Sequence, residues 1–282
     1  MKQLVNLLRI RQYYKNLLIF LPIVFAQKFF DFNALWLTVL GFIALCLISS
    51  TNYIINDILD VKKDRLHPEK RHRPIASGKI KIWQAIIIAL ILLFISVVLA
   101  AYLAMNFLYA VLFLLIFTLI YSLLLKKAVF VDILSISILL VVRAMSGAFI
   151  IDVVISQWLI FCIFFLALFL AIGKREADIK LLGKNAVKTR KVLEYYTPEI
   201  TNALMVVSTT ALILSYSLYA FFSQYKNLIY TIPFALYVIF RYFYFVYSGD
   251  KIARHPERAL LDWKIVFGIV LWALAAFIII YL

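Results

Sequence analysis

Long apolar runs separated by short polar or charged segments make up most of the chain. Each run is close to the roughly 20 residues that an α-helix needs to cross a bilayer, and turn residues or charges bound it. The pattern therefore predicts an all-α membrane protein, a bundle of about nine transmembrane helices. The predicted spans are 16–30, 34–56, 82–104, 107–125, 129–150, 156–173, 199–222, 227–247 and 264–282.

Lys and Arg residues gather in alternate connections between these spans. By the positive-inside rule, the connections that carry them face the cytoplasm. We therefore expect a multi-pass protein of the cytoplasmic (inner) membrane, with an active site that faces the cytoplasm. One transmembrane domain would span 1–282, and its cytoplasmic loops would lie near 57–81, 126–128, 174–198 and 248–263.

The composition supports a membrane class and leaves no room for a separate soluble domain. The 282 residues are 66% hydrophobic and 15% charged, against about half and a quarter in soluble proteins. The formal net charge of +15 is explained largely by the membrane topology and by attraction to anionic lipid. We expect no nucleic-acid partner. Cys46 and Cys162 are interpreted as small buried apolar residues.

An acidic segment follows the second apolar run and predicts a metal site. Asp57, Asp60 and Asp64 are spaced by three and four residues, so they share one face of a helix, and the Asn56 amide lies beside Asp60. Carboxylates on one face repel each other unless a cation lies among them. Hard oxygen ligands suit Mg²⁺, which completes its shell with water and substrate phosphates. The alternative is a solvated helix end whose acids pair with nearby Lys and Arg residues: Lys62, Lys63 and Arg65.

A basic loop, residues 65–78, comes directly after this segment, and two prolines and a glycine prevent a long helix there. Its position beside an acidic face predicts an anion clamp, in which Arg forks bind phosphate oxygens bidentately and Lys adds a mobile charge. The residues expected to bind the anion are Lys70, Arg71 and Arg73.

Further polar groups lie at the ends of other spans or within them. Asp132 and Arg143 fall about three turns apart in one predicted span, where a charged side chain needs a partner. For Arg143 the partner is either a carboxylate in a structural ion pair or an anionic ligand, and these two interpretations remain equal. Asp178 and Asp262 have no assigned role. The remaining candidates for phosphate binding are Tyr121, Lys126, Lys174, Arg175 and Glu176.

The pattern Asn56-Asp57-x-x-Asp60-x-x-x-Asp64 resembles the first aspartate-rich motif of the UbiA-type polyprenyl transferase superfamily. That resemblance implies a UbiA-like helical bundle, Mg²⁺ as cofactor and a diphosphate substrate. Most aromatic prenyltransferases of the superfamily carry a second aspartate-rich motif after the sixth helix. This chain instead has Gly173-Lys174-Arg175-Glu176 there.

Further motifs resemble the decaprenyl-phosphate phosphoribosyltransferase branch of that superfamily over nearly the whole chain. Ile10, Tyr13 and the run from Glu176 to Asp178 depart from that branch's pattern. The motifs that carry the resemblance are Arg9-x-x-Gln12-x-x-Lys15-Asn16, His67-Pro68-x-Lys70-Arg71-x-Arg73-Pro74-Ile75-Ala76-Ser77-Gly78, Tyr121-Ser122-x-x-Leu125-Lys126, Arg143-Ala144-x-x-Gly147 and Pro256-Glu257.

The resemblance implies transfer of 5-phosphoribose from phosphoribosyl diphosphate to a polyprenyl phosphate, with release of diphosphate. Asp57 and Asp60 would be catalytic through the metal, and Lys15 would steer the lipid phosphate. One rival is a prenyltransferase that moves a prenyl group from a prenyl diphosphate to an aromatic acceptor. A rival of another class is an anion transporter lined by Asp132 and Arg143, which the concentration of charge at one membrane face disfavours. The oligomeric state is not predicted.

Overall fold

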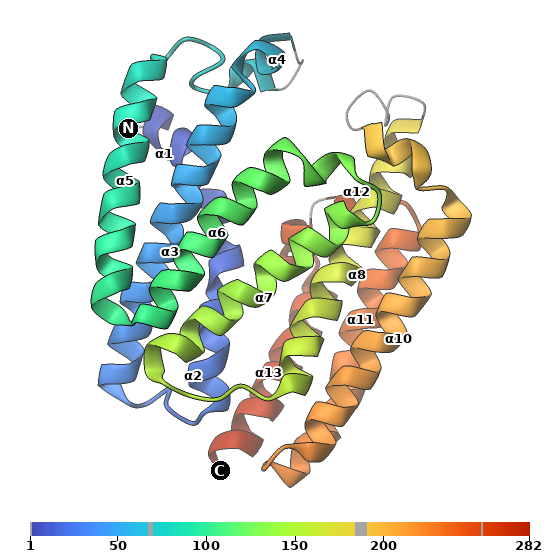
Figure 1. Cartoon of the computed structure of the whole chain (residues 1–282). Coiled ribbons are helices and arrows are strands. Elements are labelled where there is room, and N and C mark those ends of the chain that lie inside the picture. The colour runs from blue at the N-terminus through green and yellow to red at the C-terminus, as the bar shows by residue number, and fades with distance from the viewer. Residues whose placement is uncertain (1, 67–69, 184–190, 255) are drawn as a thin grey trace. The chain divides into compact units, whose positions relative to one another are not determined.

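The computed structural model describes residues 2–66, 70–183, 191–254 and 256–282. All regular secondary structure within these ranges is helical (Figure 1). The elements are α1 (Lys2–Leu8), η1 (Ile10–Phe20), α2 (Leu21–Phe25), α3 (Phe32–Leu59), α4 (Val61–Leu66), η2 (Lys70–His72), α5 (Ile82–Leu103), α6 (Met105–Leu123), η3 (Leu125–Lys127), α7 (Val131–Ile151), α8 (Gln157–Leu182), η5 (Lys191–Tyr195), α10 (Pro198–Phe222), η6 (Lys226–Thr231), α11 (Ile232–Tyr247), α12 (Lys251–Arg254), η7 (Pro256–Leu261) and α13 (Trp263–Tyr281).

Among the described residues, eight stretches are long and apolar enough to cross a membrane: α3, α5, α6, α7, α8, α10, η6 with α11, and α13. Each overlaps a predicted span, and all but α8 agree with it to within a few residues at both ends, so the multi-pass all-α architecture is confirmed. The first predicted span, 16–30, differs. Here η1 winds as a 3₁₀ helix from Ile10 and passes into the short α2, which ends at Phe25.

The irregular first span follows from its polar residues. Asn16 is 1% exposed, and its amide donates to Cys46 Sγ and Ser49 Oγ of α3 over 3.3 and 3.4 Å. Gln27, with a left-handed backbone at φ 56°, ends the segment soon after α2. A buried amide with two hydrogen-bond partners on α3 fixes this chain segment against that helix more firmly than apolar packing alone would.

The chain divides into two compact units, Met1–Leu123 with Val142–Val154, and Leu124–Val141 with Ile155–Leu282. In unit 1, α3 packs against α5, α6 and η1. Its core at the α4 end joins residues of α1, α3 and α5 with Ile75 of the basic loop. Whether the two units form the expected single transmembrane domain depends on how they join, so that expectation stays a prediction.

Unit 2 is built on α8, which packs against α10, α11 and α12, while α11 also packs against α13. Its core includes Phe169 and Ile172 of α8 with Tyr242 and Phe245 of α11. The helix α8 runs on to Leu182, beyond the predicted end of its span at 173. The segment 174–182, expected in a loop, is therefore helical.

Two glycines of unit 1 mark close approaches of its helices. A Cβ at Gly147 of α7 would overlap the backbone carbonyl oxygen of Ile19, which cannot move without disturbing η1. A Cβ at Gly41 of α3 would instead meet the terminal methyl of Ile150, which a rotamer change can displace.

We predict that Gly147→Ala destabilises the protein more than Gly41→Ala does. Overpacking of a well-packed interior typically costs about 1–3 kcal/mol, and a clash with backbone should reach the upper end of that range. Thermal unfolding of both variants in detergent, side by side with the wild-type protein, measures the difference. Equal melting temperatures for the two variants would contradict the packing described for Gly147.

Candidate active site

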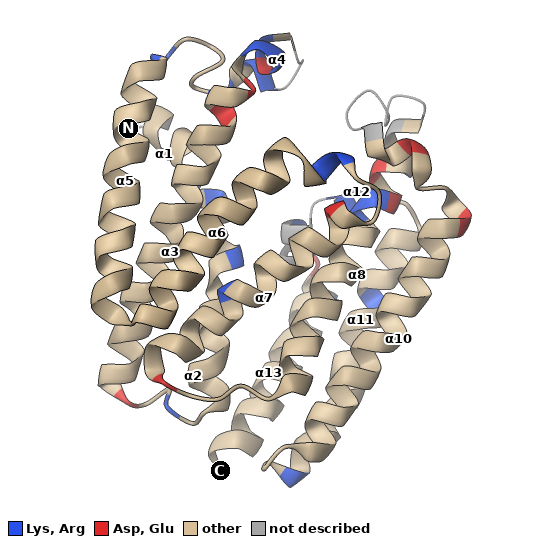
Figure 2. Cartoon of the chain, in the orientation of Figure 1, with Lys and Arg blue, Asp and Glu red and all other residues tan. Residues whose placement is uncertain are grey.

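Charged residues of unit 1 gather where α3 meets α4 (Figure 2). Asp57 and Asp64 are 2% and 3% exposed. One guanidinium nitrogen of Arg73, Nη1, donates to Asp57 Oδ1 over 3.0 Å and to Asp64 Oδ2 over 2.6 Å. Arg9 Nη2 also donates to Asp57 Oδ1, over 2.5 Å. Two buried carboxylates and two guanidiniums thus form one neutral cluster.

The backbone around Asp60 keeps the two aspartates close. Although α3 ends at Leu59, Asp60 N donates to Asn56 O and Asp64 N donates to Asp60 O, each over 2.9 Å. Helical hydrogen bonding therefore continues into α4, so Asp57 and Asp64 emerge within reach of one guanidinium. Asp60 and Asn56 are part-exposed beside them.

The basic loop is anchored by its apolar half, which sets the position of Arg73. Ile75 and Ala76 are 2% and 8% exposed, and Arg65 Nε donates to Ala76 O over 3.3 Å. Ser77 N donates to Arg73 O, and the loop turns at Gly78, whose φ of 75° favours glycine. Burial of the segment after Arg73 thus aims its guanidinium at the aspartates.

Arg9 reaches the cluster from the junction of α1 and η1. Its backbone is left-handed, with φ 51° and ψ 47°, a conformation that residues other than Gly, Asn and Asp rarely adopt. Its guanidinium carbon lies 4.9 Å from the ring centroid of Tyr53 on α3. The aromatic face and Asp57 together hold the guanidinium in place.

The predicted alternative, in which the acids pair with basic residues of α4, differs from the observed partners. The ion pairs of Asp57 and Asp64 in the described residues are with Arg9 and Arg73, while Lys62 and Lys63 are exposed. The acids therefore face inward rather than toward water.

No group of three or more His, Cys, Asp and Glu side chains is arranged to hold a metal among the residues the structure describes. The donor chemistry still fits Mg²⁺. Asp57 and Asp64 supply buried hard oxygens, and the Arg73 nitrogen between them shows that a cation fits there. Asp57, Asp60 and Asp64, with Asn56, remain the predicted ligands.

Arg143 lies in the part of α7 that belongs to unit 1, and its Nε donates to Asn16 Oδ1 over 3.0 Å. The Asn16 amide of η1 is thus one partner of Arg143, and contact of Arg143 with an anionic ligand stays a prediction. Lys15 Nζ lies 5.7 Å from the ring centroid of Tyr14. The other predicted phosphate-binding residues of unit 1 are part-exposed or exposed: Lys70, Arg71 and Tyr121.

Unit 2 holds a buried ion pair at the start of α7. Arg175 and Asp132 are 2% and 0% exposed, and Arg175 Nε donates to Asp132 Oδ2 over 3.0 Å. Tyr196 completes the group, because its hydroxyl donates to Asp132 Oδ1 over 2.6 Å and accepts from Phe130 N over 3.1 Å. Burial and the hydrogen bond to Asp132 raise the pKa of Tyr196, so its hydroxyl stays protonated. Asp132 was expected to need a partner, and the structure shows that this partner is Arg175.

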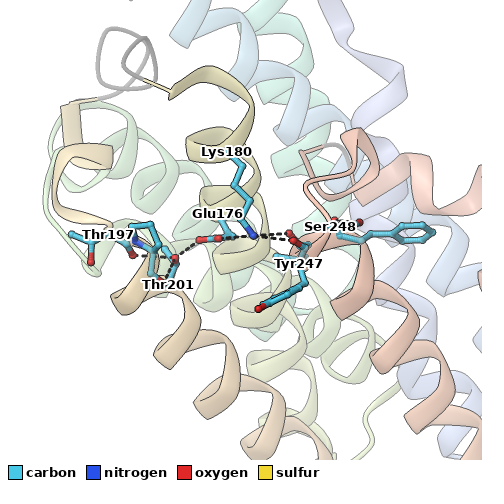
Figure 3. A network of polar contacts seen from close by, with 9 residues as sticks. Glu176, Lys180, Thr197, Thr201, Tyr247 and Ser248 are labelled. Carbon is cyan, nitrogen blue, oxygen red and sulfur yellow. Dashed lines mark hydrogen bonds and ion pairs between the residues drawn. The ribbon is translucent and has the colours of Figure 1, made fainter.

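Glu176 follows Arg175 in α8 and, together with Lys180, joins three helices (Figure 3). It is 2% exposed and accepts a short hydrogen bond from Thr201 Oγ1 of α10. Lys180, one turn further along α8, lies 2.9 Å from Glu176 Oε1 and donates to the carbonyl oxygen of Tyr247 over 3.1 Å. Glu176 and Lys180 thus tie α8 to α10 and to the end of α11.

The predicted phosphate-binding residues of unit 2 have different surroundings. Lys174 is exposed and Lys126 part-exposed, whereas Arg175 and Glu176 are buried against protein partners. Asp178 pairs with Arg254 over 2.9 Å. The motif residues His67, Pro68 and Glu69, and the part of the predicted loop at 184–190, lie outside the described residues.

Asp262 also has a structural partner. It caps α13 by accepting from Ile265 N over 2.9 Å, and Arg241 donates to its other oxygen over 3.2 Å. Burial raises the pKa of Asp262, but these hydrogen bonds outweigh burial and lower it.

Sequence inspection did not place Arg9, Tyr196 or Thr201 in any site. Arg9 is 48 residues from Asp57, and Tyr196 is 64 residues from Asp132. Periodicity reports only neighbours along one helix. The one signal for Arg9 in the sequence was its place in the motif Arg9-x-x-Gln12-x-x-Lys15-Asn16.

The fold and the comparisons with known proteins agree on a membrane-embedded transferase of the UbiA type. The model of the UbiA prenyltransferase family matches residues 17–265, and the chain belongs to this family.

Two curated relatives have the same name. A decaprenyl-phosphate phosphoribosyltransferase of Mycolicibacterium smegmatis is 33% identical over 280 residues, which cover 93% of this chain and 87% of the relative. A decaprenyl-phosphate phosphoribosyltransferase of Corynebacterium glutamicum is 30% identical, over 93% of this chain and 82% of the relative.

A solved structure has the same fold. A UbiA homologue from Archaeoglobus fulgidus, bound to DMAPP and Mg²⁺, matches with a TM-score of 0.75 and 19% identity. The match covers 95% of this chain and 98% of that one.

We predict that removing one member of the buried pair in unit 2 is costly. Arg175→Met leaves Asp132 buried without its cation, which should reduce the free energy of unfolding by about 3–5 kcal/mol. Asp132→Asn in the same chain should recover much of that loss. Chemical unfolding in detergent of the two single variants and the double variant measures the coupling.

Arg254→Met is the matched control, because its ion pair with Asp178 is partly solvated, with the Arg254 side chain 31% exposed. Such pairs are typically worth less than about 1 kcal/mol. Arg175→Met and Arg254→Met variants of equal stability would argue against a buried pair at Asp132.

Proposed function

We propose that this protein transfers 5-phosphoribose from phosphoribosyl diphosphate to a polyprenyl phosphate, with release of diphosphate and with Mg²⁺ as cofactor. The observation that carries the proposal is the cluster of Asp57, Asp64, Arg9 and Arg73 at the end of α3. Buried carboxylates next to guanidiniums can bind both halves of a metal diphosphate, since the acids take the cation and the arginines take phosphate oxygens.

The identity of the donor rests on the relatives and on the second motif. The two curated relatives are named phosphoribosyltransferases and are similar along most of the chain. Gly173-Lys174-Arg175-Glu176 stands where a second aspartate-rich motif would be expected in aromatic prenyltransferases. A donor with one diphosphate and one further phosphate calls for more cations, which suits a chain with this many Lys and Arg residues.

The metal ligands would be Asp57, Asp60 and Asp64, with Asn56 contributing its amide oxygen. When bound, Mg²⁺ neutralises charge that develops on the departing diphosphate. Arg73, together with Lys70 and Arg71, would hold the phosphate oxygens of the donor.

Bond exchange takes place at C1 of the ribose. An oxygen of the lipid phosphate attacks C1, and the bond from C1 to the diphosphate oxygen breaks, so that the electron pair leaves with diphosphate. The attacking phosphate is already an anion, so no general base is needed, and alignment with electrostatic stabilisation supplies most of the rate. Lys15 would steer the lipid phosphate toward C1.

The remaining predicted residues take two roles. Tyr121, Lys126, Arg143 and Lys174 are proposed to contact the phosphorylated donor. We assign Arg175 and Glu176 to holding the end of α8 in place, because both are buried against protein partners.

The site is proposed to face the cytoplasm. The connections rich in Lys and Arg mark that side by the positive-inside rule, and a phosphorylated sugar donor would be met there. The lipid acceptor would reach the site from the bilayer.

Purified protein supplied with labelled donors tests the function. We expect carbon label from the ribose of phosphoribosyl diphosphate to appear in the lipid fraction and to remain there after phosphatase treatment and removal of free sugars. This labelling should require polyprenyl phosphate. Label that moves only from a prenyl diphosphate into an aromatic acceptor would refute the proposal and support the rival prenyltransferase. Flux of phosphate through liposomes without any product would support a transporter.

Asp57→Asn is expected to lower turnover at least about hundredfold while the protein stays folded, because the metal loses a charged ligand. The rate of ribose transfer at saturating Mg²⁺ measures the loss. Asp152→Asn is the matched control. Asp152 is exposed, with a left-handed backbone that Asn tolerates well, so its transfer rate should equal that of the wild-type protein.

A further inference from the structure

Arg9 combines three features that no requirement of the helical fold explains. It has a left-handed backbone, it donates to a 2% exposed carboxylate, and its own side chain is 24% exposed. The junction that it occupies between α1 and η1 is a place where glycine would fit at least conformational cost. The backbone geometry thus favours a residue without a side chain, and the side chain that is present makes a contact with Asp57.

The charges of the four residues in the cluster balance when no metal is bound. Asp57 and Asp64 carry two negative charges, and Arg9 and Arg73 carry two positive charges. Adding a divalent cation to Asp57 and Asp64 leaves these four side chains with two positive charges in excess, of which the part-exposed Asp60 can offset one. Such an excess is costly unless a cation withdraws or an anion enters.

The two arginines differ in how free they are to withdraw. Arg73 bridges both aspartates and is followed by the anchored segment Pro74-Ile75-Ala76, which is buried. Arg9 contacts a single carboxylate oxygen, Asp57 Oδ1, and its guanidinium lies over the Tyr53 ring at the edge of the cluster. Since that ring can keep contact with a guanidinium while its hydrogen bonds change, Arg9 is the cation better placed to exchange partners.

We propose that Arg9 is an exchangeable counter-cation of the metal site. It neutralises Asp57 while metal and donor are absent, and its guanidinium exchanges Asp57 Oδ1 for a diphosphate oxygen when the metal takes the carboxylate. Arg9 therefore opposes binding of the metal alone and favours binding of the metal with diphosphate. This inference rests on the proposed function only for a metal and a diphosphate; it does not depend on which group is transferred.

Two binding measurements without any turnover test the proposal. The probes are Mn²⁺ alone, followed by electron paramagnetic resonance, and inorganic diphosphate in saturating Mn²⁺, followed by calorimetry. For Arg9→Gly we expect roughly tenfold tighter binding of Mn²⁺ alone and roughly tenfold or more weaker binding of inorganic diphosphate, the size expected for one charge-assisted hydrogen bond. Opposite shifts are the signature, because a merely structural role would weaken both or neither.

Arg9→Gly is suited to this test because glycine adopts the left-handed backbone at least cost, so the variant should fold. Arg9→Lys keeps the charge without the planar fork and should restore part of the diphosphate affinity. Gln27→Gly controls for glycine at a left-handed position, and Arg11→Ala controls for loss of a nearby exposed charge. Both controls should bind both probes as the wild-type protein does.

Unchanged or weaker binding of Mn²⁺ alone to Arg9→Gly would overturn the proposal. So would tighter Mn²⁺ binding with unchanged diphosphate affinity, because Arg9 would then be a fixed counter-ion only. If the opposite shifts are found and no ribose is transferred from phosphoribosyl diphosphate, the inference about Arg9 stands and the proposed function fails.

Discussion

One guanidinium nitrogen between two buried carboxylates is the interaction on which the candidate site depends. Arg73 Nη1 bridges Asp57 and Asp64, and without a cation those two charges would repel each other in a medium that screens them weakly. The surrounding chain serves this geometry. Helical hydrogen bonds continue through Asp60 into α4, and burial of Ile75 anchors the basic loop that carries Arg73.

The same kind of interaction has a different use in unit 2. There the buried pair of Asp132 and Arg175 joins the start of α7 to α8, and Tyr196 adds the chain that follows η5. Glu176 and Lys180 bind α8 to α10 and α11. The polar residues that end α8 therefore hold helices together, and Lys174, which is exposed, is left as the member of the motif that faces solvent.

Much of the helical pattern was predictable because it depends on local composition. A span needs a continuous apolar run, and such runs are visible in the sequence without any knowledge of packing. The first span was the exception, since Asn16 binds Cys46 and Ser49 and the backbone winds as a 3₁₀ helix around that contact. The extension of α8 to Leu182 was also hidden, because its charged residues are stabilised by partners on other helices.

The candidate site was predictable to the extent that it lies on one helix. The spacing of Asp57, Asp60 and Asp64 indicated a shared face, and two of them do meet at one guanidinium. Their partners were not predictable in this way. Arg9 and Asp57 are 48 residues apart, and no periodic signal connects residues that meet only after the chain has folded.

We propose that the buried aspartates hold a divalent cation on a diphosphate. Electron paramagnetic resonance of Mn²⁺ bound to the protein, with ¹⁷O-labelled inorganic diphosphate, tests this most directly, because a directly coordinated ¹⁷O broadens the Mn²⁺ signal. We expect a protein-bound signal that the label broadens, and its loss when both Asp57 and Asp64 are replaced by Asn. A broadened protein-bound signal that persists in the double variant would place the metal elsewhere and contradict the account.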